Sequence, residues 1–470
     1  MKTFKTLINH KYFIVYFMLF IATPKNLLGI ALKNITSFPI INTQQISVFG
    51  NPSYINKSTV ITESGAYALN NTLTFNPSEP GSACIVIDAD NVIFDLNRNA
   101  IIQTTQQEQS SGIFIKQGRK NIVIRNGSIR KMSAYGIYIS DGADMITINT
   151  INIDNVGLAG IKADGLKGRV GISNITCSNV AIQNIVNAQD ASIYGIILKY
   201  TTIANLEKCM SNNLLSNAGN CNGFKIKKCS SIRFDSCIAN KISGDGLFTI
   251  GFNIINSKGA MTLECLSTNN SSLNTDPSSL VLGFNSERSN NQFYSQCTAG
   301  GNSNEYSICG FRLIDVTTCQ LIQCQALTNN STSLDATGYL INGGTDIECN
   351  MCESHDNVGI NFGYGFHAIN TSNNIITKAK SHFNQGTNKI SYGIYLEKVS
   401  NSTITNNIIL GNGTNREGYG IFDDTNAETN TILSNYAQKN QKNYIPADPI
   451  IPIFAGPLSA TPSPFENISI

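Results

Sequence analysis

A glycine followed by alternating apolar residues recurs twelve times between residues 112 and 420, with a mean spacing of about 28 residues. The sequence around it is similar each time, as in Gly-Ile-Phe-Ile at 112 and Gly-Ile-Tyr-Leu at 393. Strict alternation over a few residues is the period of a β-strand, so each glycine is expected to act as the turn residue in front of a short strand. Repeats of this length predict a solenoid, in which stacked coils share one core. The glycines are Gly112, Gly136, Gly160, Gly195, Gly223, Gly246, Gly283, Gly310, Gly338, Gly365, Gly393 and Gly420.

Two further strands follow each glycine-led strand in most repeats. The second lies about ten residues later, as at 122–124 and 232–234, and the third ends at an asparagine. Asparagine tolerates the left-handed turn conformation, and its amide can bond to the equivalent amide one coil away. The closing asparagines are Asn179, Asn212, Asn240, Asn269, Asn302, Asn329, Asn357, Asn384, Asn412 and Asn440.

The strand pattern favours one kind of solenoid. No helical period occurs after residue 45, and β-branched residues occupy the inward positions where a leucine-rich repeat would carry leucine. Pro277 is the only proline between residues 81 and 445, as expected where nearly every backbone N–H joins a ladder. The sequence therefore predicts an all-β fold, a right-handed parallel β-helix solenoid of about twelve coils.

The ends of the chain differ from the repeat. Residues 1–31 carry three lysines ahead of an apolar run at 12–22, and Pro24 follows the run, which predicts a secretory signal peptide; an uncleaved membrane anchor is the alternative. Residues 32–111 are expected to open and cap the solenoid, 112–440 to form the β-helix, and 441–470 to form a Pro-rich tail. Long steps in the repeat predict protruding loops near 181–191 and 267–279. The predicted location is secreted, periplasmic or on the cell surface, with any membrane contact made through an uncleaved N-terminal segment.

Several features match a known family. Ser64, Gly65, Tyr67 and Leu69, the strand at 95–97 with the sequence Asp-Leu-Asn, and the Gly-Ile-x-Ile coils resemble bacterial right-handed parallel β-helix repeat proteins of the pectin lyase-like superfamily. The resemblance covers roughly residues 60–440 and implies the fold. It does not imply one activity, because the superfamily contains lyases, hydrolases, epimerases, tailspikes and adhesin-like rods.

The catalytic motifs of that superfamily are missing or misplaced. Asn274-Thr275-Asp276 resembles a polygalacturonase motif but lies in a Ser/Asn-rich insertion, and the Gly-His-Gly and Arg-x-Lys motifs are absent. Pro277 has no arginine shortly before it, as a pectate lyase motif requires, and it is followed by Ser278 rather than the histidine of alginate epimerases. These mismatches favour a non-catalytic protein.

One stripe of side chains has the composition of a carbohydrate-binding surface. The second residue after each glycine is expected to point outward, and Asp164 lies two positions beyond one of them. Aromatic rings could stack on sugars and cations could bind acidic groups; the alternative is that exposed strand positions favour aromatic residues anyway. The candidate glycan-binding residues are Phe114, Tyr138, Lys162, Asp164, Lys225, Phe248, Arg312, His367, Tyr395 and Phe422.

Other polar residues are weaker candidates. Asp164, Asp235, Asp245 and Glu264 could act as acids or bases or bind calcium, but no motif holds two of them together. His355 and His382 occupy matching turns and are expected to stack, which favours packing over a metal site. No cofactor and no metal site are predicted, except that calcium is possible if the chain is an enzyme.

The 13 cysteines are unusual for an exported chain. Six of them, Cys209, Cys237, Cys265, Cys297, Cys324 and Cys352, recur at steps of 27 to 32 residues, so they are expected to form one column. Parallel side chains that point inward rarely reach disulfide geometry, which favours buried free thiols. A zinc site at Cys349-x-x-Cys352, with Cys319 and Cys324 nearby, is the less favoured alternative.

The sequence favours a non-catalytic, exported, adhesin-like protein that binds a polysaccharide or cell-surface glycan along the stripe. The alternative is a polysaccharide lyase, glycoside hydrolase or epimerase that acts on an acidic polysaccharide near Lys162, Asp164 and Lys225, beside the loop at 181–191. A net charge of +2 provides no basic surface for nucleic acid, which is not an expected partner.

Overall fold

The computed structural model describes residues 51–105, 109–168, 171–187, 191–413, 418–425, 429–446 and 468–469. The predicted signal peptide and most of the expected Pro-rich tail lie outside these ranges. Within them the regular structure consists of β-strands, numbered β1 to β47. A helix long and apolar enough to cross a bilayer does not occur in the described ranges.

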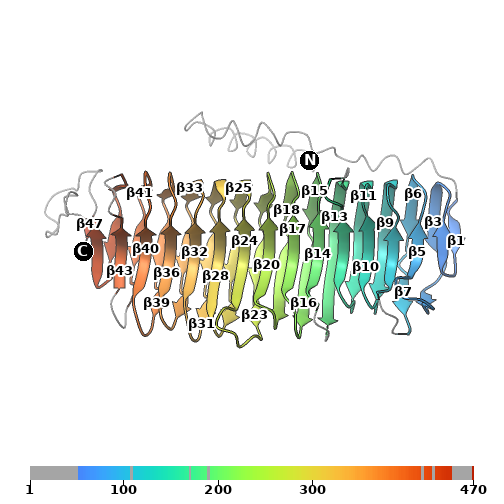
Figure 1. Cartoon of the computed structure of the whole chain (residues 1–470), viewed down its shortest axis with the longest axis horizontal. Coiled ribbons are helices and arrows are strands. Elements are labelled where there is room, and N and C mark those ends of the chain that lie inside the picture. Colours follow the sequence, from blue (N-terminus) through green and yellow to red (C-terminus); the bar gives the residue numbers. More distant parts are fainter. Residues whose placement is uncertain are drawn as a thin grey trace, which may run out of the picture. The chain divides into compact units, whose positions relative to one another are not determined.

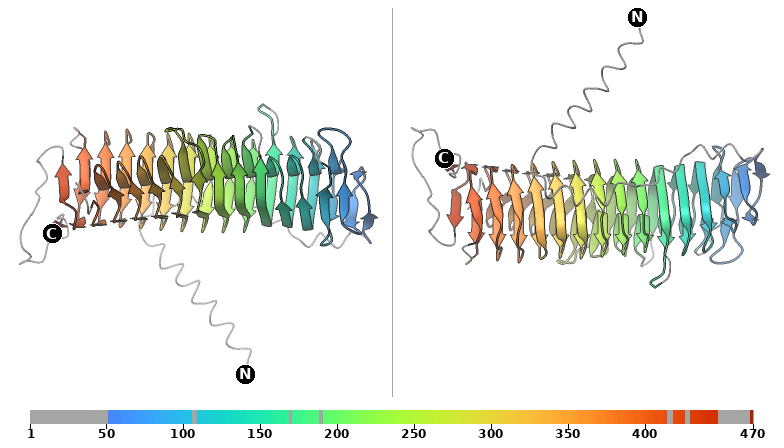
Figure 2. Two further views of the ribbon diagram at one scale, coloured as in Figure 1. Left: turned by 90° about the horizontal axis from the view of Figure 1, so that it is seen from below. Right: turned by 90° about the horizontal axis from the view of Figure 1, so that it is seen from above.

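One strand of every coil joins a 15-stranded sheet, which we call sheet B. Figures 1 and 2 show these strands side by side, from β5 at the N-terminal end to β43 near the C-terminal end. In order they are β2 (Thr59–Ile61), β5 (Ala83–Ile87), β8 (Ser111–Ile115), β10 (Tyr135–Ser140), β12 (Ala159–Asp164), β14 (Ile193–Lys199), β17 (Cys221–Lys227), β20 (Phe248–Ile255), β24 (Leu280–Glu287), β28 (Ser307–Ile314), β32 (Ala336–Asn342), β36 (Gly363–Ile369), β40 (Ser391–Glu397), β43 (Gly418–Asp424) and β46 (Lys442–Pro446).

The remaining 32 strands complete the coils as a second hydrogen-bonded surface, sheet A. Its N-terminal members are β1 (Ser53–Ile55), β3 (Gly65–Leu69), β4 (Leu73–Phe75), β6 (Val92–Asp95), β7 (Ala100–Gln103), β9 (Lys120–Arg130), β11 (Asp144–Asp154), β13 (Ser173–Asn187), β15 (Ala204–Glu207), β16 (Met210–Ser216), β18 (Ile232–Asp235), β19 (Ile238–Gly244), β21 (Met261–Leu263), β22 (Leu266–Thr268) and β23 (Ser271–Ser272). The others are β25 (Asn290–Ser295), β26 (Thr298–Gly300), β27 (Ser303–Asn304), β29 (Thr317–Ile322), β30 (Gln325–Leu327), β31 (Asn330–Ser331), β33 (Thr345–Asn350), β34 (Glu353–His355), β35 (Val358–Gly359), β37 (Ile375–Thr377), β38 (Lys380–His382), β39 (Gln385–Gly386), β41 (Thr403–Thr405), β42 (Ile408–Leu410), β44 (Thr431–Leu433), β45 (Tyr436–Gln438) and β47 (Ile468–Ser469).

Strands pair in parallel with their equivalents one coil away. In sheet B, for example, β10 lies between β8 and β12, so that Tyr138 is in register with Phe114 and Lys162. The twelve predicted coils correspond to β8 through β43. The segment expected to cap the solenoid contains regular strands of its own, since β2 and β5 extend sheet B and β3, β6 and β9 pair in series.

All of the recurring glycines except Gly246 lie inside the sheet B strands rather than in turns, which corrects their expected role. At Gly136 an added Cβ would lie 2.6 Å from Ile153 Cγ2 and 2.7 Å from the carbonyl oxygen of Gly160. The same close approach to the next glycine carbonyl recurs along the column, as at Gly283 with Gly310. Glycine is needed here because no room exists for a side chain, not because the backbone turns.

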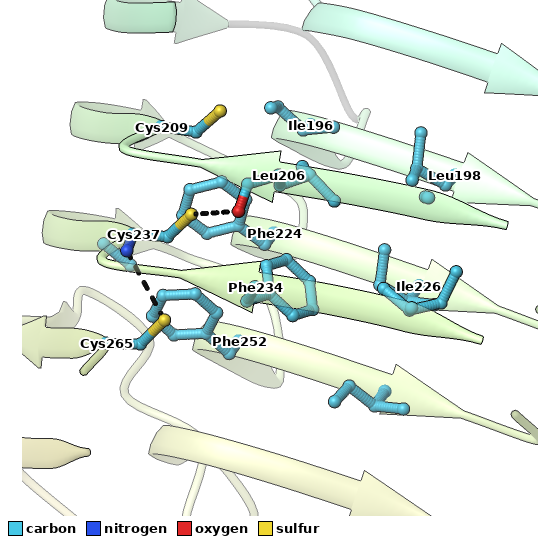
Figure 3. Close-up of a cluster of buried hydrophobic side chains, with 14 of the residues drawn as sticks. Ile196, Leu198, Leu206, Cys209, Phe224, Ile226, Phe234, Cys237, Phe252 and Cys265 are labelled. Atoms are coloured by element: carbon cyan, nitrogen blue, oxygen red, sulfur yellow. Dashed lines mark hydrogen bonds between the residues drawn. The ribbon is translucent and has the colours of Figure 1, made fainter. Parts of the chain in front are cut away.

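The core lies between the two sheets and consists of stacked inward side chains. Phe224 and Phe252 stack with ring centroids 4.8 Å apart, and Phe234 meets Phe252 edge to face at 5.5 Å (Figure 3). Isoleucine fills the equivalent positions in the N-terminal coils, as at Ile137 and Ile161. Burying a side chain of this size contributes about 1.5–3 kcal/mol, so each coil adds its own share of stability.

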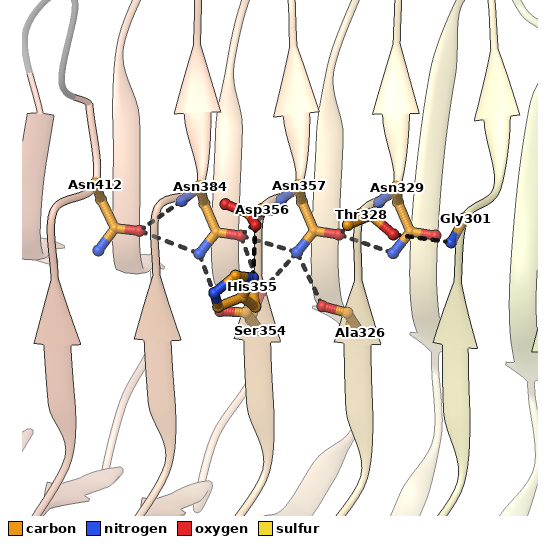
Figure 4. Close-up of polar contacts among 10 residues, drawn as sticks. All are labelled: Gly301, Ala326, Thr328, Asn329, Ser354, His355, Asp356, Asn357, Asn384 and Asn412. Carbon is orange, nitrogen blue, oxygen red and sulfur yellow. Dashed lines mark hydrogen bonds and ion pairs between the residues drawn. The ribbon is translucent and has the colours of Figure 1, made fainter.

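The asparagine ladder is confirmed in the C-terminal half. Asn329 Nδ2 donates to Asn357 Oδ1 at 2.7 Å, and Asn357 Nδ2 donates to Asn384 Oδ1 at 2.8 Å (Figure 4). The series continues through Asn412 to Asn440 and begins before Asn302. Each Oδ1 also accepts from the backbone N–H of the preceding ladder residue over most of the series.

Two details of the expected ladder are wrong. Asn269 is exposed and its neighbour Asn270 occupies the ladder, while the predicted members Asn179, Asn212 and Asn240 lie outside the buried series. The left-handed residue is the one before each ladder asparagine, such as Thr328 (φ 51°), Asp356 (φ 52°) and Phe383 (φ 49°). The turn is therefore made one residue earlier, and the amide is left free to stack.

All 13 cysteines are buried and unpaired, which confirms the expected free thiols. Their thiols donate to main-chain carbonyls, as Cys209 Sγ does to Cys177 O at 3.4 Å and Cys237 Sγ to Leu206 O at 3.2 Å. Burial raises the pKa of Cys177 to about 12 and that of Cys229 to about 11. The thiolate is the reactive form, so these groups are chemically quiet in the folded chain.

Asn357→Ala is expected to lower the free energy of unfolding by about 2–4 kcal/mol, because it leaves the buried amides on both sides without a partner. Asn149→Ala is the matched control, since Asn149 is half-buried and its side chain bonds only to the adjacent Thr150. The control is expected to stay within about 0.5 kcal/mol of the wild type. Equal effects in denaturant unfolding would contradict a structural role for the ladder.

The thiols are expected to resist iodoacetamide in the native protein and to react fully in denaturant, because folding excludes solvent from all of them. Intact-mass measurement before and after denaturation reads out both states. Extensive native labelling, or a disulfide between successive members such as Cys237 and Cys265, would contradict this assignment.

Candidate functional site

The outward face of sheet B carries the predicted stripe. Strand register places its members in one column, as Phe114 with Tyr138, Tyr138 with Lys162, and His367 with Tyr395. Arg312 and Phe422 occupy the same column further along. The column therefore has the geometry that the sequence predicts.

Phe248 is the exception, and its expected position is wrong. Lys225 is in register with Asn253, because Gly251 rather than Gly246 occupies the repeated position, where an added Cβ would meet the carbonyl oxygen of Gly283 one coil on. Phe248 lies at the start of β20, beside Leu280. Two glycines five residues apart in one coil made the sequence ambiguous at this point.

A group of lysines gathers where β12, β14 and β17 lie side by side (Figure 1). We call Lys162, Asp164, Lys199, Lys225 and Lys227 the lysine cluster. Asp164 Oδ2 lies 3.2 Å from Lys162 Nζ, and Asp164 Oδ1 lies 3.3 Å from Lys199 Nζ. Neither Lys225 nor Lys227 has a carboxylate within ion-pair distance in the described part of the chain. The cluster thus holds four ammonium groups and one carboxylate.

Tyrosine side chains lie beside this cluster, in the column formed by the residues that immediately precede the repeat glycines. Lys162 Nζ donates to the Tyr135 hydroxyl at 3.1 Å and lies 4.7 Å from the centre of that ring. Lys225 Nζ lies 5.2 Å from the ring centre of Tyr194. Tyr138 stacks on Phe114 at 5.3 Å. Sequence reasoning missed Tyr135 and Tyr194, although the residue before each repeat glycine also recurs at a regular spacing and could have identified them.

The two central lysines differ in pKa. Burial lowers the pKa of Lys162, but the Tyr135 hydroxyl and the Asp164 carboxylate outweigh burial and raise it above the ordinary value. The pKa of Lys225 is lowered, first by burial and then by the charges of Lys227 and Lys199. Burial raises the pKa of Tyr194. At neutral pH the site therefore combines the ammonium of Lys162, the amine of Lys225, which releases its proton more easily than an ordinary lysine, and the protonated phenol of Tyr194.

The middle of the column is closed to ligands by its own hydrogen bonds. Asn285 Nδ2 donates to Asn253 Oδ1 at 2.9 Å, and Asn253 Nδ2 donates to Asn222 Oδ1 at 2.7 Å. Arg312 donates to Asn285 Oδ1 at 3.0 Å. Arg312 therefore continues a polar ladder, at a distance of several coils from the lysine cluster.

The weaker candidates lie apart from the cluster. Asp235 pairs with Arg233 at 2.6 Å, and Asn274 accepts from the N–H of Asp276 in a local turn. His355 and His382 do lie one above the other, edge to face at 5.9 Å. In the described ranges no group of three or more His, Cys, Asp or Glu side chains could hold a metal ion, which includes Cys349 and its neighbours.

The sequence matches no family model and no curated protein. Among solved structures it is similar to the periplasmic alginate epimerase AlgG, with 11% identity, a TM-score of 0.45, and coverage of 79% of this chain and 85% of that one. The right-handed parallel β-helix expected from the sequence is confirmed by the strand pairing of this chain.

Two other solved structures show the same fold. One is the A-module of a mannuronan C-5 epimerase from Azotobacter vinelandii, with 14% identity, a TM-score of 0.41, and coverage of 79% and 90%. The other is a mannuronic acid specific polysaccharide family 6 lyase from human gut microbiota, with 11% identity, a TM-score of 0.35, and coverage of 78% and 79%. At these identities the β-helix itself is what the chains share.

These structures are epimerases and a lyase, and this finding overturns the expectation of a non-catalytic glycan-binding protein. Only the alternative, an enzyme that acts on an acidic polysaccharide, is carried forward. The reaction itself must be argued from the side chains of this chain.

Asp164→Asn is expected to lower the pKa of Lys162, because the carboxylate is one of the groups that raise it. Loss of the two half-exposed ion pairs should cost only about 1 kcal/mol or less in unfolding free energy. NMR titration of 13C-methylated lysines measures both lysine pKa values. Lys225 should titrate below Lys162 in the wild type, and the reverse order would contradict the described electrostatics.

Proposed function

We propose that this chain is an enzyme that removes the proton beside the carboxylate of a uronic acid unit in an acidic polysaccharide, as lyases and epimerases do. The observation that carries the proposal is Lys225, a largely buried amine with a lowered pKa between two further lysines and beside a tyrosine. A buried amine with a perturbed pKa, gathered with other charged groups, is a candidate for a functional site.

The first requirement of the reaction is a cation at the substrate carboxylate. Removal of the C5 proton places negative charge on that carboxylate, so ammonium groups that bind it stabilise the developing charge. Lys199 and Lys227 flank Lys225 along the adjacent outward column. Asp164 holds Lys199 by an ion pair and so limits its freedom. Lys199 and Lys227 are therefore suited to bind the carboxylate of the substrate.

The second requirement is a base and an acid. The neutral amine of Lys225 would take the C5 proton, and its lowered pKa makes this form more accessible than in an ordinary lysine. The protonated phenol of Tyr194 would supply a proton. Delivered to the glycosidic O4, that proton completes elimination as the C5–H and C4–O4 bonds break and the C4–C5 double bond forms. Delivered to C5 from the opposite face, it completes epimerisation.

Calcium and an exported location belong to the same proposal. The described residues offer no cluster that alone could hold a metal ion, so substrate carboxylates would have to complete a calcium site. Acidic polysaccharides are extracellular polymers, which fits the N-terminal signal expected from the sequence. Assays therefore use the exported form of the chain, with and without calcium.

Lys225→Ala is expected to lower turnover of the substrate at least about 100-fold, the usual contribution of a general base. Lys225→Arg should fail as well, since a guanidinium keeps its proton. Lys258→Ala is the matched control, because Lys258 is an exposed lysine on a neighbouring coil. Wild-type activity should rise with pH as Lys225 loses its proton, along a limb that begins below the ordinary lysine pKa of 10.5.

The assay uses alginate, polygalacturonate and other polyuronates. Unsaturated products are followed by absorbance, new reducing ends by colorimetry, and C5 configuration by proton NMR. Absence of all three changes over the whole panel would refute the proposal, and full activity of Lys225→Ala would refute the assigned site.

A further inference from the structure

A second cluster lies on the same outward face, five coil steps from Lys225, which is roughly 24 Å at the spacing of β-strands. It extends over β36, β40 and β43, the orange strands of Figure 1. We call its six ring residues the aromatic patch: Tyr364, His367, Tyr392, Tyr395, Tyr419 and Phe422.

Most of the rings in the aromatic patch stack face to face on one another. Tyr364 stacks on Tyr392 at 5.3 Å, and Tyr392 stacks on Tyr419 at 5.4 Å. His367 stacks on Tyr395 at 4.8 Å in the next column. A ligand on this surface therefore meets ring edges and hydroxyl groups rather than open ring faces.

Two carboxylates border the patch in the adjacent column. Glu397 and Asp424 are in register on β40 and β43. The Tyr395 hydroxyl donates to Asp424 Oδ2 at 3.4 Å, and Glu397 Oε2 lies 3.6 Å from His367 Nε2. That nitrogen is buried and has no hydrogen-bond partner among the described residues. The patch and its border thus contain two carboxylate acceptors and a ring nitrogen, His367 Nε2, that makes no hydrogen bond to the described residues.

Glu397 and Asp424 disfavour a uronic acid at their end of the patch. Burial lowers the pKa of His367 to about 4, so at neutral pH the imidazole does not neutralise Glu397. Neither Glu397 nor Asp424 has a lysine or arginine within ion-pair distance in the described ranges. A substrate carboxylate placed here would meet like charge, in contrast to the lysine cluster.

A cationic ligand fits no better. Cations bind over ring faces, and the outer rings already carry lysines of this chain. Lys389 Nζ lies 5.0 Å from the ring centre of Phe362, and Lys442 Nζ lies 5.2 Å from that of Tyr419. The remaining choice is a ligand that is uncharged, rich in hydroxyl groups and rigid.

We propose that the aromatic patch, with Glu397 and Asp424, is a separate subsite for uncharged pyranose units of a polysaccharide. Hydroxyls of the sugar would donate to the two carboxylates and approach His367 Nε2, while its C–H groups pack on the ring edges. The inference rests on the proposed function in so far as the ligand is a carbohydrate. It adds that the substrate combines acidic units at the lysine cluster with neutral units five coils away.

The experiment measures binding of defined hexasaccharides to the full chain by calorimetry. The probes are neutral hexamers of xylose, mannose and glucose, a hexagalacturonate, and a glucosamine hexamer. At least one neutral hexamer should bind with an affinity that salt leaves unchanged, because no net charge is involved. The glucosamine hexamer and hexagalacturonate should bind the patch more weakly.

Variants test whether the aromatic patch and its two carboxylates bind the neutral sugar. Tyr395→Ala and the double variant Glu397→Gln with Asp424→Asn should weaken neutral binding at least about tenfold, since charged hydrogen bonds are lost. Lys258→Ala is the matched control, because Lys258 is an exposed lysine outside both clusters, and it should leave neutral binding unchanged. The double variant should also bind hexagalacturonate more tightly than the wild type, because the repelling carboxylates are gone.

The outcomes are distinct from those for the enzyme. Turnover of polyuronates without binding of any neutral hexamer would overturn the subsite and leave the proposed reaction intact. Binding of a neutral hexamer without turnover of any polyuronate would support the subsite and refute the proposed reaction. Tighter binding of the glucosamine hexamer, or loss of neutral binding in Lys258→Ala but not in Tyr395→Ala, would also overturn the subsite.

Discussion

The parallel hydrogen-bonded ladder between successive coils is the constraint on which the rest of this structure depends. Each strand is in register with its equivalent one coil away, so every side chain has the equivalent side chain of the next coil as a neighbour. Asparagine stacks on asparagine, thiol on thiol and phenylalanine on phenylalanine because the backbone leaves no other partner within reach. A repeat that drifted by one residue would turn its core outward.

The same constraint concentrates charge on the outward face. In most folds, three lysines on neighbouring strands would separate or pair with carboxylates. Here the register keeps Lys199 and Lys227 adjacent, with Lys225 beside them and only Asp164 to compensate. Burial and the charges of Lys227 and Lys199 together lower the pKa of Lys225. A bound anion would offset these positive charges.

Hydrogen bonds among its own side chains also divide the outward face along its length. Between the two ends, Asn222, Asn253 and Asn285 satisfy one another and are almost fully buried. Such a segment offers little to a ligand, since its hydrogen bonds are already made. The lysine cluster and the aromatic patch lie on either side of this segment. A rigid stack fixes the separation of these two surfaces, so a polymer that spans both must match it.

The sequence by itself determined the repeat, the strand alternation and the column of residues from Phe114 to Phe422, because a parallel solenoid converts linear spacing directly into position. It could not decide which of Gly246 and Gly251 packs on the next coil, and so it misplaced Phe248; only the contact with the Gly283 carbonyl decides that. Nor could it show that Tyr135 and Tyr194 join the lysines, or that the rings of Tyr364 and Tyr392 occupy each other's faces. Those facts depend on side chains from different coils meeting across the sheet, and burial and the resulting pKa of Lys225 follow only when the coils are stacked.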